Sequence, residues 1–131
     1  REAVQLAAHI NQAFETLSDP LQRARYLLEQ KRGIVEGEDS QTSSDMDFLM
    51  QQMALRERLE DIPSAASPLE EVDAMKVELK TEFDELCDRF EQQYLDDDSV
   101  AATGTLSKMK FYRRLQETLR DLEAKLEDEL F

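Results

Sequence analysis

The stretch FLMQQMALRERLEDI, residues 48–62, carries large apolar side chains on two opposite faces of one predicted helix. At about 100° per residue, one set of side chains falls on a stripe typical of a core-facing side. This set comprises Phe48, Gln52, Leu55, Leu59 and Ile62. A second set, Leu49, Met50 and Met53, points nearly the opposite way. A helix surface in water does not require such side chains, so the second face raises the question of what covers it.

The second face becomes acidic toward its C-terminal end, where Glu57, Glu60 and Asp61 follow the apolar residues. An apolar centre with a charged edge is typical of a protein interface, because the apolar groups supply buried area and the charges supply steering and register. Packing against another part of the same chain is the alternative, since an interdomain contact would also bury such a patch.

The composition favours an all-α protein without nucleic acid or an anionic membrane as its main partner. In 131 residues, 35% are charged and only 3 are Gly and 3 Pro, which indicates long solvated helices in one domain, or in a small domain with an appendage. The net charge of −14 would repel nucleic acid and anionic lipid. No apolar run approaches the roughly 20 residues that span a bilayer.

The chain is predicted to hold two helical sections joined by a polar connector. The first section is interrupted by SDP at residues 18–20, because Ser and Asp are capping residues and the position before Pro disfavours helix. A short helix, LQRARYLLEQK, follows. The connector is rich in Gly, Ser, Thr and acids, which is typical of a linker. The predicted units are a first section at residues 1–32, a linker at 33–46 and a helical domain at 47–131.

Three amphipathic helices are predicted in the last unit. The first ends at PSAASP, residues 63–68, and the other two each carry one apolar stripe at spacings of three or four. The middle stripe comprises Leu69, Val72, Met75, Leu79, Phe83, Leu86, Phe90 and Tyr94. The last comprises Leu115, Leu119, Leu122, Leu126 and Leu130. Three helices with one stripe each predict an antiparallel three-helix bundle.

No catalytic or metal-binding constellation is evident. His9 is the single histidine and has neither a nucleophile nor a second ligand at metal spacing nearby, so we interpret it as a surface or packing residue. Cys87 lies at the fringe of an apolar stripe, which favours an inert, buried thiol. Residues 96–98, DDD, lack the EF-hand spacing, which favours a solvated turn with Ser99 as the following helix cap over a calcium site.

One basic and aromatic segment, KMKFYRR at residues 108–114, has two interpretations. Bases mixed with aromatic residues occur on surfaces that bind single-stranded nucleic acid. In an acidic chain, neutralising neighbouring acids within the bundle is the favoured alternative.

Three segments resemble one family of proteins. Residues 10–29, INQAFETLSDPLQRARYLLE, resemble the end of a J-domain, where the third helix closes with an A-F/Y-x-x-L-x-[DH]-P element and a short fourth helix follows. The RARYLL variant within it, together with residues 48–62, resembles the HscB family, the J-type co-chaperones of iron-sulfur cluster assembly. Residues 108–126, KMKFYRRLQETLRDLEAKL, resemble the last helix of that family.

This resemblance implies a non-enzymatic co-chaperone of the bacterial cytoplasm that needs no cofactor. In the family, the C-terminal bundle binds the cluster scaffold protein IscU, and a His-Pro-Asp loop of the J-domain engages an HscA-type, DnaK-like chaperone and stimulates its ATPase. The sequence contains no His-Pro-Asp, and His9 is not followed by Pro and Asp. The chain is therefore expected to begin inside the J-domain, and no chaperone-activating residue can be assigned to it.

The resemblance also implies a scaffold-binding face. Carried over position by position, that face comprises Leu49, Met50, Met53, Glu57, Asp61 and Phe111. Ala54 stands where the family often has an acidic residue, so one polar contact would be absent. Phe111 lies near the edge of the last stripe, so a place in the core is its alternative. The alternative function is a structural bundle that self-associates weakly through Leu49, Met50 and Met53.

Overall fold

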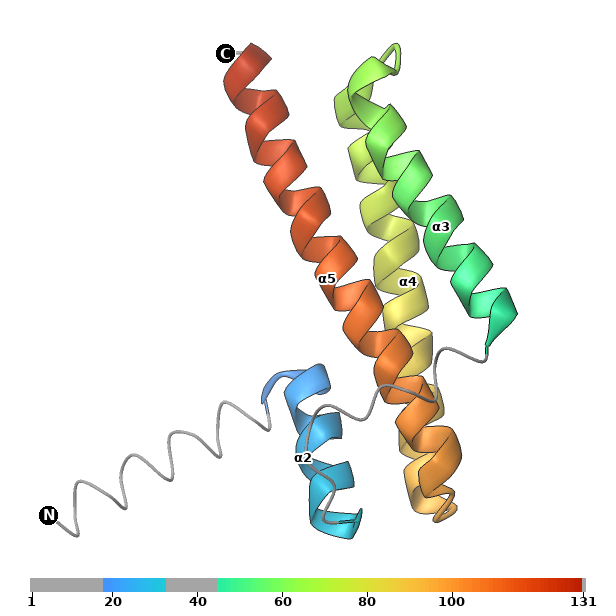
Figure 1. Ribbon diagram of the computed structural model, residues 1–131. Helices are drawn as coiled ribbons and strands as arrows, with labels where there is room; N and C mark the ends of the chain where they lie inside the picture. Colours follow the sequence, from blue (N-terminus) through green and yellow to red (C-terminus); the bar gives the residue numbers. More distant parts are fainter. Residues whose placement is uncertain (1–17, 33–44, 131) are drawn as a thin grey trace, which may run out of the picture.

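The computed structural model describes residues 18–32 and 45–130, and all regular structure in these two ranges is helical. The elements are α2 (Pro20–Arg32), α3 (Met46–Asp61), the 3₁₀ turn η2 (Ile62–Ser64), α4 (Pro68–Leu95) and α5 (Ser99–Leu130). Successive helices α3, α4 and α5 run antiparallel, with α2 beside the lower half of α5 (Figure 1). The all-α class and the antiparallel bundle are confirmed. The predicted helix before residue 18, with His9, and the connector at 33–44 lie outside the described residues.

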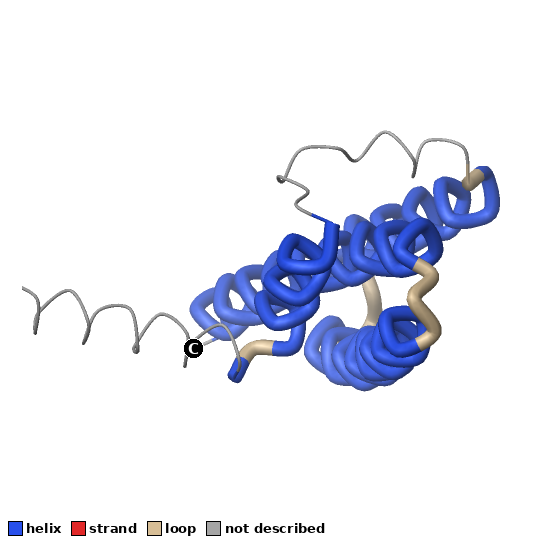
Figure 2. The backbone as a smooth tube through the Cα atoms, turned by 90° about the horizontal axis from the view of Figure 1, so that it is seen from below, coloured by secondary structure: helices blue, strands red, loops and turns tan. Residues whose placement is uncertain are grey.

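The two interruptions predicted from proline and small residues occur where expected. Before α2, the Asp19 carboxylate accepts a hydrogen bond from the backbone N–H of Gln22 at 3.2 Å, and Pro20 begins the helix. Between α3 and α4, the chain makes the short turn η2, and Pro68 begins α4. Figure 2 shows the molecule from below, where short connections lead from α3 to α4 and from α4 to α5.

The turn between α4 and α5 corrects one predicted cap. Asp97 has φ of 62°, a left-handed conformation that Asp tolerates better than most residues. The next residue, Asp98, is the cap, because its carboxylate accepts a hydrogen bond from the N–H of Ala101 at 3.1 Å. Ser99 is the first residue of α5 and not its cap. Asp caps helices at least as well as Ser, and both stood side by side in the sequence.

One hydrophobic core runs through the bundle. The predicted α4 stripe is confirmed, with six side chains buried and the two end residues, Leu69 and Tyr94, partly buried. On α5, Leu115, Leu119 and Leu126 are buried and Leu122 is partly buried. Leu130 was predicted to share this stripe, but its side chain is 62% exposed. The upper end of α5 spreads away from α4 (Figure 1), so Leu130 has no helix to pack against.

Helix α2 shares this core instead of forming a separate one. Leu21, Ala24 and Leu28 are buried in the same cluster as the α4 and α5 stripes. An ion pair also holds each end of α2: Asp19 pairs with Arg113 of α5 at 2.9 Å, and Lys31 pairs with Asp97 at 2.7 Å. The proposed boundary between residues 32 and 47 remains a prediction, but α2 and the bundle pack as one unit.

Candidate partner-binding face

The N-terminal end of α3 is fixed by a cap and one buried ring. The Asp45 carboxylate accepts a hydrogen bond from the N–H of Phe48 at 3.0 Å and lies 3.3 Å from the Lys108 ammonium of α5. The hydrogen bond from Phe48, and then Lys108, lower the pKa of Asp45 below its ordinary value. Phe48 is the one buried residue of α3. This end of the helix is therefore held by α5.

Phe48 meets an aromatic cluster on α5. Its ring packs edge-on against Phe111 with centroids 5.5 Å apart, and Phe111 packs in the same way against Tyr112 at 5.3 Å. Two cations cover these rings: Lys108 lies 5.5 Å from the Phe48 centroid, and the Arg56 guanidinium lies 5.7 Å from the Phe111 centroid. The cluster fixes which side of α3 faces the core.

Phe111 is therefore a core residue, the alternative that the sequence left open for it, and its role in partner binding remains a prediction. Its side chain is 3% exposed, beneath Phe48 and Arg56. Helix α5 touches α3 on one side and α4 on another, so its buried surface is wider than the single leucine stripe. Phe111 therefore packs against the first turn of α3 through Phe48.

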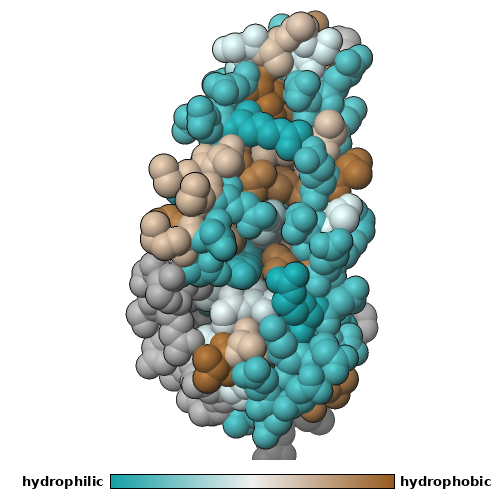
Figure 3. Space-filling view, turned by 90° about the vertical axis from the view of Figure 1, so that its right-hand side faces the viewer, coloured by the Kyte–Doolittle hydropathy of each residue, from teal (hydrophilic) through white to brown (hydrophobic). Residues whose placement is uncertain are grey.

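The opposite side of α3 is apolar and exposed. The exposed fractions are 43% for Leu49, 64% for Met50 and 64% for Met53. Met46, one turn earlier, is 62% exposed and extends the same side. Figure 3 looks onto this side of the molecule and shows hydrophobic atoms gathered beside hydrophilic ones. We call Met46, Leu49, Met50 and Met53 the α3 apolar face. Sequence reasoning missed Met46 by placing it in the linker, although its spacing of three, four and seven from the others was the available signal.

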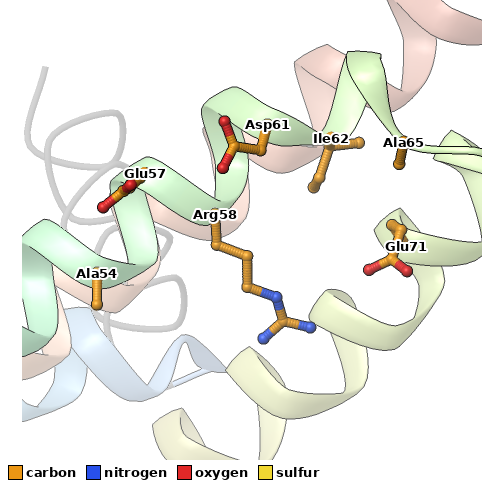
Figure 4. Close-up of a pocket in the computed structure, with 7 residues that line it drawn as sticks. All are labelled: Ala54, Glu57, Arg58, Asp61, Ile62, Ala65 and Glu71. Atoms are coloured by element: carbon orange, nitrogen blue, oxygen red, sulfur yellow. The ribbon is translucent and has the colours of Figure 1, made fainter.

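The acidic end of α3 borders a groove between α3 and α4. Glu57 and Asp61 are exposed, and both line the groove together with Glu71 of α4 (Figure 4). The groove has a volume of about 340 Å³, and small or apolar side chains, Ala54, Ile62 and Ala65, form much of its wall.

One cation of the groove is already paired. The Arg58 guanidinium bonds Glu78 of α4 at 2.6 Å, which raises the pKa of Arg58 and lowers that of Glu78. This pair joins the last turn of α3 to α4, but both side chains are substantially exposed, so its contribution to stability is small.

Comparisons with known proteins match this architecture. Residues 44–120 match the family model described as the HSCB C-terminal oligomerisation domain. The co-chaperone protein HscB homolog of Photobacterium profundum is 37% identical over 121 residues, which cover 92% of this chain and 70% of that protein. The chain belongs to the HscB family. The structure of chaperone HscB from Vibrio cholerae superposes with a TM-score of 0.84 at 36% identity, covering 95% of this chain and 73% of that one.

The fold of this chain is also similar to that of a yeast co-chaperone. Jac1 from Saccharomyces cerevisiae has a TM-score of 0.73 at 25% identity, covering 89% of this chain and 78% of that one. Relatives of this HscB-family chain are thus co-chaperones, in agreement with the resemblance in residues 10–29, 48–62 and 108–126.

Two remaining sequence features, the basic segment and Cys87, are explained by the structure of this HscB-family chain. Lys108 and Arg113 pair with Asp45 and Asp19, which supports the interpretation that the basic segment neutralises neighbouring acids. Cys87 is partly buried, and burial, followed by the charge of Asp84, raises the pKa of its thiol to about 11. Such a thiol is protonated at neutral pH and unreactive.

Neither a metal centre nor a membrane span is found in the part of the chain that the structure describes. Within residues 18–32 and 45–130, no three His, Cys, Asp or Glu side chains are grouped as metal ligands would be. None of the helices in these ranges combines the length and the apolar character required to cross a bilayer.

Proposed function

We propose that this chain is a non-enzymatic co-chaperone that binds an IscU-type iron-sulfur scaffold on the α3 apolar face and delivers it to an HscA-type, DnaK-like chaperone. The observation that carries this proposal is the exposure of four large apolar side chains on one side of α3, in a chain of the HscB family. Isolated exposed apolar residues are ordinary, but a contiguous group bordered by charge marks an interaction site.

The proposed mechanism is supported by the packing of α2 against the bundle. Helix α2, which resembles the last helix of a J-domain, packs in the same core as the bundle that presents α3. A scaffold held on α3 and a chaperone held by a complete J-domain would be kept at a fixed separation. This raises the effective concentration of one for the other, and the J-domain, when complete, stimulates the chaperone's ATPase. No step in this mechanism requires a cofactor.

Self-association through the same face is the second candidate. The matching family model is described as an oligomerisation domain, and residues 44–120 that match it include the α3 apolar face. A second copy of the chain would bury Met46, Leu49, Met50 and Met53 as a scaffold would. The strong net negative charge of −14 opposes close approach of two copies.

Two measurements on the purified chain separate the candidates. Calorimetric titration with an IscU-type scaffold should give saturable one-to-one binding, and sedimentation equilibrium of the chain alone should give a monomer at the same concentration. A dimer that binds no scaffold would replace the proposed function by the second candidate.

A further inference from the structure

The groove between α3 and α4 is open and lies beside the α3 apolar face. Ala54 and Glu57 are each one helical turn beyond Met50 and Met53, so a segment lying along that face reaches the groove next. In Figure 4, Ala54 stands at one end of the groove, where its side chain is a single methyl group. Ile62 and Ala65 continue an apolar wall that can contact the methylene groups of a long side chain.

The charges around the groove are mainly negative. Glu57 and Asp61 of α3 and Glu71 of α4 approach it from two helices. Within residues 18–32 and 45–130, the structure gives these three carboxylates no ion pair. Arg58 crosses the groove and attracts Glu71 at longer range, but its guanidinium is bonded to Glu78 at 2.6 Å. The pair of Arg58 and Glu78 is neutral, which leaves three negative charges around the opening.

We propose that this groove receives an arginine side chain from the protein segment that binds the α3 apolar face. The inference rests on the proposed function, and it adds the chemistry of the partner segment: apolar side chains over α3, followed by an arginine at the C-terminal end of that helix. A guanidinium suits the site because it is a permanent cation whose planar fork can donate two hydrogen bonds to a carboxylate. Ala54 is the residue that determines specificity, since a larger side chain there closes the groove.

The first test needs no scaffold. The ¹⁵N-labelled chain is titrated with N-acetyl-arginine amide, with N-acetyl-leucine amide as the control probe, while backbone amide shifts are followed. The arginine probe should shift the amides around Ala54, Asp61 and Ala65 with saturation, and the leucine probe should not.

Two variants and their matched controls locate the site. Ala54→Leu fills the groove and should abolish arginine binding there. Glu71→Gln removes one charge and should weaken arginine binding about tenfold, the loss of one charge-assisted hydrogen bond. Ala124→Leu and Glu85→Gln change exposed positions on α5 and α4 outside the groove and should leave binding unchanged. Arginine shifts spread evenly over the acidic faces, or full binding by Ala54→Leu, would overturn the proposal.

The same variants are then titrated with the IscU-type scaffold. Weaker scaffold binding by Ala54→Leu and Glu71→Gln, with both controls unaffected, supports the assigned occupant. Scaffold binding that both variants retain in full would refute the groove proposal while the proposed function stands. A parent chain that binds arginine in the groove but no scaffold would refute the proposed function and leave the groove as a cation site.

Discussion

Phe48 and Phe111 determine, at the scale of single residues, which side of α3 is left for a partner. The helical wheel of residues 48–62 separates Phe48 from Leu49, Met50 and Met53, and the structure confirms that separation. A helical wheel could not place Phe111 in the same way, because three positions close together on α5, Met109, Phe111 and Tyr112, are all buried. A helix that packs against several elements has no single stripe, and its interface residues cannot be distinguished by period alone.

Replacing Phe111 should therefore impair stability first and partner binding second. Phe111→Ala leaves a cavity under Phe48 and should lower the free energy of unfolding by about 3–5 kcal/mol. Phe111→Leu refills part of the space and should recover much of that loss, together with scaffold binding. Denaturant unfolding of both variants measures the effect. A Phe111→Ala chain as stable as its parent would return Phe111 to the exposed face.

The thiol of Cys87 should react slowly. A pKa of about 11 against an ordinary 9.0 lowers the thiolate fraction near pH 8 by ~100-fold. Alkylation by iodoacetamide should be slower by about this factor than in the unfolded chain in urea, and it should accelerate as the pH rises toward 11. Equal rates in the folded and unfolded chain would contradict the burial described.

Helix α3 is attached, at the scale of elements, mainly by its ends and only lightly along its length. Phe48 and the Asp45 cap hold the first turn, Ile62 follows the last, and Leu55 and Leu59 between them are only partly buried. The sequence predicted every described helix and both proline-marked turns, because capping, proline and apolar spacing act locally. It failed at the α5 cap, where two capping residues, Asp98 and Ser99, stand side by side. It also failed at Leu130, whose burial depends on how far the end of α5 spreads from the first turns of α4.

The Asp45 cap should make the stability of this helix end depend on pH. The folded-state pKa of Asp45 lies below its ordinary value of 3.8, so its stabilisation is present above that value and is lost as the pH falls through the folded-state pKa. Asp45→Asn should therefore reduce stability more at pH 6 than at pH 2.5. Denaturant unfolding at both values tests this, and an equal reduction at the two would show that the carboxylate charge is not involved.

At the scale of the whole molecule, a net charge of −14 is combined with one continuous core in residues 18–32 and 45–130. That α2 packs on α4 and α5 was not predictable from the sequence, since the apolar stripe of a short helix does not state its partner. The ties between Lys31 and Asp97 and between Asp19 and Arg113 join residues 66 and 94 positions apart, beyond any local pattern. The net charge, by contrast, can be counted from the sequence, and it affects the rate of association with a charged partner.

Scaffold association should consequently depend on salt. In the proposed interface, Glu57 and Asp61 would lie at the rim, where charge mainly affects the association rate and is screened over about 10 Å at 0.1 M ionic strength. Stopped-flow association rates should fall as salt rises, and a Glu57→Gln, Asp61→Gln double variant should lose much of that dependence. An identical salt slope in parent and variant would remove these acids from the interface.

The measurement that tests the account most directly is scaffold titration of a Leu49→Ala, Met50→Ala, Met53→Ala variant beside its thermal unfolding. These side chains are exposed, so the variant should melt close to the parent, within about 0.5 kcal/mol of stability, while scaffold binding is lost because a few apolar anchors carry most of an interface's energy. Leu55→Ala is the control, expected to cost roughly 2 kcal/mol and to keep binding while folded. A triple variant that melts far below the parent, or that binds the scaffold normally, would contradict the assignment of the α3 apolar face.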